Sequence, residues 1–215
     1  MQQTSVLRPD KKRRMTREEK ARETYMHILE AAAQVVGEDG YAEASVSKIT
    51  RLAGVAQGTF YNYFESRQQI FDQLLPYMGR QMLDHIRHTV APDLTGARRE
   101  EARLRAFFGY LNAHPSFYRI LYEAEIFAPR AHAEHFRLLV EGYRGSLGRA
   151  VDRGEIDGYS DQELEAVIYV LLAARAYLSL RYVYDGKGGT APPPEHVVEA
   201  YVKLVTRGLF TPPAP

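Results

Sequence analysis

Polar side chains of the kinds that contact nucleic acid gather between residues 45 and 67. Amide groups, as on Gln57 and Asn62, can pair with the edge of an adenine, and a threonine such as Thr59 offers a methyl or a hydroxyl. Hydroxyl and cationic groups at helix ends can reach phosphate oxygens, and a glycine lets the backbone approach a duplex closely. The candidate residues are Ser45, Ser47, Lys48, Gln57, Gly58, Thr59, Tyr61, Asn62, Tyr63 and Arg67. For Tyr61 and Tyr63, packing in the core is the alternative role.

A cationic segment precedes these residues. Eight basic and three acidic residues stand between positions 8 and 22, although the net charge of the whole chain is only +1. We interpret residues 1–16 as a flexible arm in which Lys11, Lys12, Arg13 and Arg14 add phosphate contacts or enter a minor groove. The alternative is a solvated leader without a role in binding.

Three helices are expected to position the polar cluster. Apolar residues recur at steps of three and four from Arg17 to Asp39, after which Gly40 is placed as a left-handed cap. A shorter helix begins at the cap Ser45, with Val46, Ile49, Leu52 and Ala53 as its apolar face, and Gly54 ends it. After a tight turn, residues 57–64 form a third helix with Phe60 and Phe64 in the core. The layout is that of a helix-turn-helix, whose last helix enters the major groove.

The rest of the chain also has helical periodicity, in longer segments. Ser66 caps a helix to about His88 with a kink or break at Pro76, and helices follow over 95–114, 116–127 and from Pro129 to about Gly154. Helices over 161–184 and 195–209 complete an all-α fold. We divide the chain into the arm (1–16), a DNA-binding domain (17–65) and a helical effector-binding and dimerisation domain (66–215).

The segment from Ile49 to Arg67 resembles the DNA-binding signature of the tetracycline-repressor (TetR) family. It reads ITRLAGVAQGTFYNYFESR, against a family pattern of Ile-Ala, two residues, Ala-Gly-Val, two residues, Gly-Thr, one residue, Tyr, two residues, Phe, two residues and Lys. The resemblance covers about residues 20–70. Thr50 replaces an alanine, which could alter packing or add a phosphate-facing hydroxyl, and Arg67 replaces a lysine with a planar donor.

Beyond residue 70 the resemblance implies the architecture and the partners. It implies a helical ligand-binding domain and a homodimer formed by the two C-terminal helices, over 161–184 and 195–209. Two recognition helices about 34 to 36 Å apart would then bind a pseudo-palindromic operator in double-stranded DNA. A repressor released by a small-molecule effector is the function that the resemblance favours.

The larger domain is rich in aromatic residues that could line an effector pocket, although aromatics at helical spacing are more often core. The candidate effector-binding residues are Phe107, Phe108, Leu111, Phe117, Leu121, Glu125, Phe136, Tyr143, Tyr169 and Arg175. Arg175 lies in an apolar run, where a buried charge requires a partner such as Glu125 or the acid group of a ligand, unless it lies at the surface or a dimer rim. We therefore expect an apolar or amphipathic effector, for example an acyl-coenzyme A or a fatty acid.

Other functions find little support in the residues. The chain has no cysteine, which excludes disulfides and thiol chemistry and favours the cytoplasm. The pairs His85/His88 and His132/His135 lack a third ligand, no nucleophile, base and orienting group cluster together, and the apolar stretch 167–184 contains two arginines. We expect no cofactor, no metal, no enzymatic activity and no membrane partner. An enzyme on a helical scaffold, or a ligand-binding adaptor that no longer recognises DNA, remain the alternatives.

Overall fold

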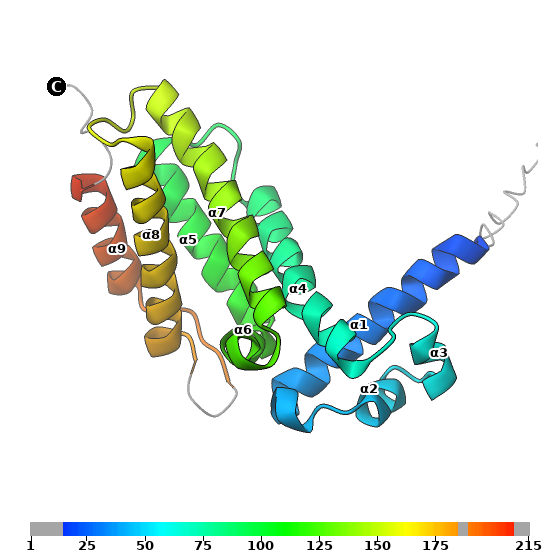
Figure 1. Cartoon of the computed structure of the whole chain (residues 1–215). Helices are drawn as coiled ribbons and strands as arrows, with labels where there is room; N and C mark the ends of the chain where they lie inside the picture. Colours follow the sequence, from blue (N-terminus) through cyan, green and yellow to red (C-terminus); the bar gives the residue numbers. More distant parts are fainter. Residues whose placement is uncertain (1–14, 185–188, 209–215) are drawn as a thin grey trace, which may run out of the picture.

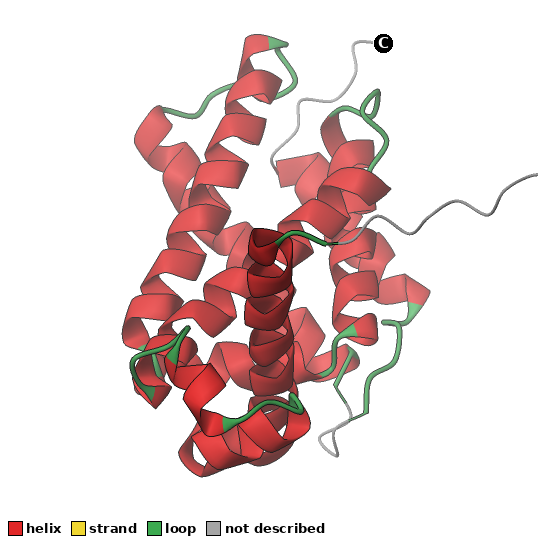
Figure 2. Cartoon of the chain, turned by 90° about the vertical axis from the view of Figure 1, so that its right-hand side faces the viewer, coloured by secondary structure: helices red, strands yellow, loops and turns green. Residues whose placement is uncertain are grey.

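The computed structural model describes residues 15–184 and 189–208, and over these ranges the protein is all-α, as predicted. The helices are α1 (Arg17–Glu43), α2 (Val46–Leu52), α3 (Gln57–Tyr61), α4 (Arg67–Thr89), α5 (Gly96–Ala113), α6 (Ser116–Phe127), α7 (Pro129–Asp152), α8 (Asp161–Tyr182) and α9 (Glu195–Gly208). In the described part of the chain, extended pairing is limited to one isolated bridge between Tyr184 and Thr190. Figure 2 accordingly shows helices and loops alone for the described residues.

Side-chain caps explain where several helices begin. The hydroxyls of Ser45 and Ser66 accept hydrogen bonds from the backbone N–H groups three residues later, at 3.2 and 3.1 Å. Thr16 and Ser160 form reciprocal capping boxes with glutamates three residues on, at the starts of α1 and α8. These bonds satisfy amides that have no partner within their own helix.

The end of α1 differs from the expectation. Gly40 has the positive φ predicted for a cap, 83°. The helix nevertheless continues after Gly40, and α1 ends at Glu43. Tyr41 is fully buried, with its ring on Phe71 and Phe127. The left-handed residue therefore redirects the chain so that this ring reaches the core.

Two other expectations hold only in part. Of the kink or break expected at Pro76, the break does not occur, because α4 continues to Thr89; the residues around Pro76, Leu74, Leu75 and Tyr77, are buried, and this packing offsets the missing hydrogen bond. The third helix ends at Tyr61 rather than Phe64. Phe60 and Phe64 are both fully buried as predicted, but Phe64 reaches the core from a turn.

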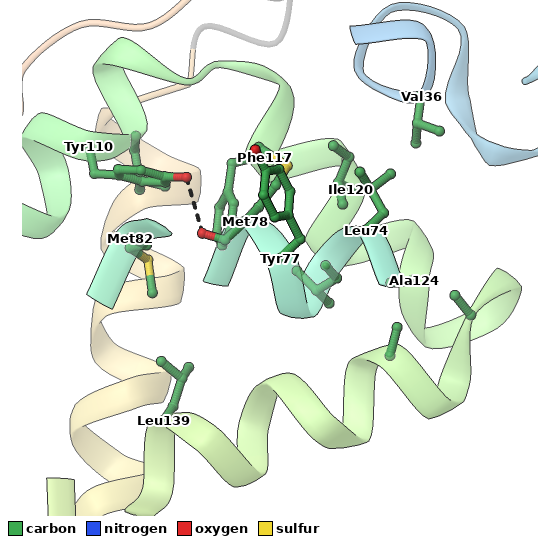
Figure 3. Close-up of a cluster of buried hydrophobic side chains, with 14 of the residues drawn as sticks. Val36, Leu74, Tyr77, Met78, Met82, Tyr110, Phe117, Ile120, Ala124 and Leu139 are labelled. Atoms are coloured by element: carbon green, nitrogen blue, oxygen red, sulfur yellow. Dashed lines mark hydrogen bonds between the residues drawn. The ribbon is translucent and has the colours of Figure 1, made fainter. Parts of the chain in front are cut away.

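The helices form a small group and a larger bundle, which meet where α1 packs against α4 and α6. In Figure 1, α1, α2 and α3 lie at one end, α4, α5, α7, α8 and α9 form the bundle, and α6 lies between them. Figure 3 shows the buried cluster at this junction, where the hydroxyl of Tyr110 donates a hydrogen bond of 3.1 Å to the carbonyl of Met78. The cluster joins α1 to the bundle through Val36, Leu74 and Ile120.

Candidate functional site

The segment α2, turn and α3 has the geometry of a helix-turn-helix. Ile49 and Ala53 of α2 and Phe60 of α3 are buried on one side, and Gly54 between the helices has a φ of 63°. This conformation strains residues with a Cβ, so glycine suits the turn. The fixed turn holds α3 against the core by one face and leaves the opposite face open.

The open face of α3 carries most of the residues predicted to contact DNA. Gln57, Gly58, Tyr61 and Asn62 are exposed, and Tyr61 is 55% exposed. Nothing lies within 4 Å of the position that a Cβ on Gly58 would occupy. The outer surface therefore has amide, hydroxyl and bare backbone groups side by side, while Thr59 is half-buried at its edge.

Tyr63 has a mixed environment. Its side chain is half-buried and its ring lies 6.3 Å from that of Tyr25 on α1, so the ring packs between helices. Although the ring packs between helices, a contact between the Tyr63 hydroxyl and a phosphate stays a prediction.

The residues flanking α3 make contacts that the sequence did not reveal. Ser47 is exposed, but the ammonium of Lys48 forms an ion pair of 2.8 Å with Asp39. Arg67 donates hydrogen bonds to the carbonyls of Ala42 and Ala44 at 3.4 and 3.2 Å, which ties the start of α4 to the end of α1. In this structure, the guanidinium of Arg67 thus holds the helix-turn-helix in place.

Two expectations about α2 need correction, and the expectation about the basic arm concerns residues that the structure does not describe. Leu52 is exposed, 44%, so it does not belong to the apolar face. The hydroxyl of Thr50 does not face outward: the residue is buried and donates to the carbonyl of Ser47. The arm residues Lys11, Lys12, Arg13 and Arg14 lie outside the described residues.

The bundle encloses a cavity of about 440 Å³ between α4, α5, α6, α7 and α8, within the range of ligand-binding pockets. Apolar and aromatic side chains dominate its wall, and five arginines join them. The lining residues are Met82, Leu83, Ile86, Arg87, Val90, Arg99, Arg103, Phe107, Leu111, Phe117, Tyr118, Leu121, Tyr122, His135, Phe136, Leu139, Gly142, Tyr143, Arg149, Leu172, Arg175, Ala176, Ser179 and Tyr184.

Most of the predicted pocket residues line this cavity. Those that do are Phe107, Leu111, Phe117, Leu121, Phe136, Tyr143 and Arg175. Three predicted residues do not: Phe108 is buried in the core on another face of α5, and Glu125 and Tyr169 are exposed on α6 and α8. One step along a helix turns a side chain by about 100°, so these errors are errors of helix face.

The arginines of α5 and the lining residues of α4 were not among the residues predicted from the sequence. Arg99, Arg103, Phe107 and Leu111 follow one another at steps of four, which places them on one helix face. Once Phe107 and Leu111 were chosen, this spacing could have identified both arginines.

Arg175 is buried and paired, but not with the predicted Glu125. Its guanidinium lies 2.6 Å from a carboxylate oxygen of Glu100 on α5, and the hydroxyl of Tyr201 on α9 donates to the same oxygen at 2.6 Å. Burial alone would lower the pKa of Arg175, but the adjacent carboxylate raises it above its usual value. Arg175 is therefore cationic and already has its counter-ion.

Two further cavity residues are affected by burial. Burial lowers the pKa of Arg103, whose guanidinium lies 5.8 Å from the centre of the Tyr143 ring. His135 is almost fully buried, and burial together with the neighbouring His132 lowers its pKa to about 4. The imidazole is thus neutral at pH 7, and its Nδ1 has no hydrogen-bond partner among the described residues.

Two further kinds of feature are absent from the described residues. No group of three histidine, aspartate or glutamate side chains is arranged to hold a metal ion in this part of the chain. No helix within the same ranges is long and apolar enough to cross a membrane.

Known proteins resemble the chain most clearly at its N-terminal end. Residues 28–74 match the sequence model of the bacterial regulatory proteins of the tetR family. The fatty acid metabolism regulator protein of Bacillus subtilis is 36% identical over 74 residues, or 34% of this chain and 38% of that protein. The transcriptional repressor KstR2 of Rhodococcus jostii is 24% identical over 189 residues, or 86% and 90% of the two chains. Over residues 28–74, the chain thus has the sequence of a regulatory-protein domain of the tetR type.

Solved structures share the whole fold. FadR of Bacillus subtilis, in a complex with stearoyl-CoA, has a TM-score of 0.68 and 22% identity, covering 86% of this chain and 98% of its own. The fatty acid degradation regulator FadR of Bacillus halodurans has a TM-score of 0.69 and 22% identity, covering 85% and 94%. The common fold is a helix-turn-helix followed by a helical bundle.

Proposed function

We propose that this protein is a ligand-responsive transcriptional repressor that binds a pseudo-palindromic operator as a homodimer and releases it when an effector occupies the cavity. The main support is that one chain combines a TetR-type helix-turn-helix, in which α3 has an exposed polar face, with an apolar cavity that contains arginines. Helix α4 follows α3 in the chain and lines the cavity, and α6 also lines the cavity and packs against α1.

An exposed apolar stripe on α8 supports the homodimer. Tyr169, Val170, Tyr177 and Leu180 are exposed and, at about 100° per residue, fall within roughly 100° of the helix circumference. Tyr177 is 73% exposed, and Leu204 on the neighbouring α9 is 70% exposed. A stripe of large apolar side chains is typical of a helical surface that packs on a partner. Two copies joined there would present two α3 helices to one face of a duplex.

The shape and lining of the cavity support an amphipathic anion as the effector. An apolar wall suits an alkyl chain, and the arginines suit a carboxylate or phosphate. A fatty acid or an acyl-CoA combines both groups. Two similar proteins, a fatty acid metabolism regulator and a FadR bound to stearoyl-CoA, point to the same class.

Selection of bound duplexes from a random pool tests the DNA-binding half of the proposal. We expect the selected site to be a pseudo-palindrome and its affinity to fall steeply with salt. Gln57→Ala is expected to change the preferred bases, because the amide is exposed on α3, whereas Tyr63→Phe is expected to weaken all sites alike. Sequence-independent binding at every salt concentration would instead favour the adaptor that no longer recognises DNA.

The effector half is tested on the selected duplex by fluorescence anisotropy. Lauroyl-CoA and laurate are titrated into the preformed complex, and release at concentrations that also raise the melting temperature of the free protein is expected. If neither compound releases the duplex or stabilises the protein, this class of effector is wrong.

A further inference from the structure

The arginines of the cavity lie toward one end of it, with the Tyr143 ring beside Arg103 and Arg175, and the other aromatic side chains lie toward the opposite end. On α5, Arg99 and Arg103 precede Phe107 and Leu111, and α5 runs toward α6. The helices α4 and α7 run in the opposite direction, and their lining arginines, Arg87 and Arg149, stand near their C-terminal ends (Figure 1). The basic end of the cavity therefore faces away from α6 and the helix-turn-helix.

The apolar end lies against α6. The residues of α6 that line the cavity there are Phe117, Tyr118, Leu121 and Tyr122, and the ring of Tyr184, after α8, lies tilted against that of Tyr118 with ring centres 4.1 Å apart. A ligand with one polar and one apolar end is thus matched to the cavity in a single orientation.

The five lining arginines are not equally available to a ligand. Arg175 is paired with Glu100 through Nη2, while its buried Nε has no hydrogen-bond partner among the described residues, and Arg87 forms an ion pair of 2.8 Å with Asp84. Arg99 donates to the carbonyls of Pro92 and Leu94, at 3.3 and 3.0 Å.

Arg103 and Arg149 remain. Among the described residues, neither makes a hydrogen bond or an ion pair, and the guanidinium of Arg103 lies 5.8 Å from the centre of the Tyr143 ring. Arg103 is also half-buried, so its charge has lost part of its hydration, and the nearby carboxylate of Glu100 is already paired with Arg175. A charge in that state is stabilised by an anion that enters beside it, because charge-assisted hydrogen bonds are strong where water is partly excluded.

Resting on the ligand-responsive regulator proposed above, we infer that Arg103, flanked by Arg99 and Arg149, is the anion-binding subsite of the cavity. It holds the carboxylate or phosphate head of an amphipathic ligand and directs the apolar tail toward α6. Arg175, for which the sequence left the acid group of a ligand as one of several possible partners, instead joins α5, α8 and α9 through Glu100 and Tyr201.

The test compares three ligands that share a twelve-carbon chain: laurate, lauroyl-CoA and the uncharged 1-dodecanol. Isothermal titration calorimetry measures the Kd of each for the full-length wild type, Arg103→Gln and the control Arg98→Gln, which removes an exposed arginine that does not line the cavity. We expect Arg103→Gln to weaken the binding of an anionic ligand about tenfold, or about 1.4 kcal/mol, and to leave the Kd of dodecanol unchanged. Arg98→Gln is expected to leave all three unchanged.

A loss confined to laurate or to lauroyl-CoA supports the subsite and identifies its head group as carboxylate or phosphate. Equal losses for the anions and dodecanol, or no loss at all, overturn the subsite while the proposed effector class stands. A wild type that binds none of the three overturns both. Should Arg103→Gln not fold, Arg149→Gln, at an exposed side chain, provides the same comparison.

Discussion

At the residue scale, the contact between Gly79 and His135 shows how closely the wall of the cavity is packed. A Cβ at Gly79 on α4 would overlap the imidazole of His135 on α7. The missing side chain lets a buried, neutral ring lie against the backbone of α4, beside the Phe117 ring at 5.8 Å. Glycine costs helix stability, so its presence within α4 is explained by this approach.

Gly79→Ala is expected to lower the free energy of unfolding by about 1 to 3 kcal/mol, the usual range for overpacking. Urea denaturation followed by circular dichroism measures the change. The control is Gly109→Ala on α5, where a Cβ meets nothing within 4 Å, so that alanine should stabilise by about 0.4 to 1 kcal/mol. Equal effects of the two substitutions would contradict the proposed overlap.

His135 gives the stability a pH dependence of known sign. Its pKa is about 4 in the folded protein and about 6.5 in an unfolded chain, so below pH 6.5 the unfolded state binds a proton that the folded state does not. Stability is therefore lost between pH 6.5 and pH 4, by up to about 3 kcal/mol.

Urea denaturation at pH 7.5 and pH 5.0 checks this dependence. His135→Leu is expected to lose less stability than the wild type between the two values, whatever its stability at pH 7.5. His196→Gln, at an exposed histidine, is expected to keep the wild-type dependence. The assignment fails if His135→Leu also keeps it.

At the element scale, local signals predicted helix positions well where they were strong. Pro115, Pro129 and the cap Ser66 mark the starts of α6, α7 and α4 as expected, because each acts through its own backbone. Pro76 does not break α4, because burial of its neighbours, which is a tertiary effect, outweighs the local cost of the proline. The resemblance identified the residues on α3, and the structure shows which of them are exposed.

The cavity was only partly predictable for a related reason. Aromatic content indicated the correct helices, but Phe107 and Phe108 differ in role only through the face that each presents to α4 and α7. The partner of Arg175 could not be found locally either, since Glu100 is 75 residues away in sequence. Such pairings depend on the crossing of helices, which periodicity alone does not specify.

The stripe on α8 leads to a prediction about assembly. Tyr177→Lys places a charge at the centre of the exposed apolar surface and is expected to convert the proposed dimer to a monomer at micromolar concentration, because an unpaired charge is costly in an interface core. Size-exclusion chromatography with light scattering measures the mass. Val151→Lys, at a partly exposed position on α7, is the control and should not change it. A dimeric Tyr177→Lys would place the interface elsewhere.

At the scale of the whole molecule, α6 has the cavity on one face and α1 on the other. Phe117 and Leu121 line the cavity, whereas Arg119 donates to the carbonyl of Glu38 and Glu123 accepts from the N–H of Tyr41 at 2.8 Å. Any ligand that shifts α6 therefore acts directly on the end of α1, next to the residues that carry α2 and α3. A ligand can change DNA affinity only through such a difference between two arrangements.

Glu123→Ala is expected to separate the two activities. The variant removes the hydrogen bond that joins α6 to Tyr41, yet Glu123 does not line the cavity and lies far in sequence from α3. We expect operator binding and lauroyl-CoA binding each to stay within about threefold of the wild type, while the concentration of lauroyl-CoA needed for half-release rises about fivefold or more, since allosteric couplings are typically about 1 to 3 kcal/mol. Anisotropy titrations of the selected duplex, with and without ligand, measure operator binding and half-release, and isothermal titration calorimetry measures lauroyl-CoA binding. Glu125→Ala, an exposed glutamate on the same helix, is the matched control, and coupling through α6 is disproved if the two variants respond alike.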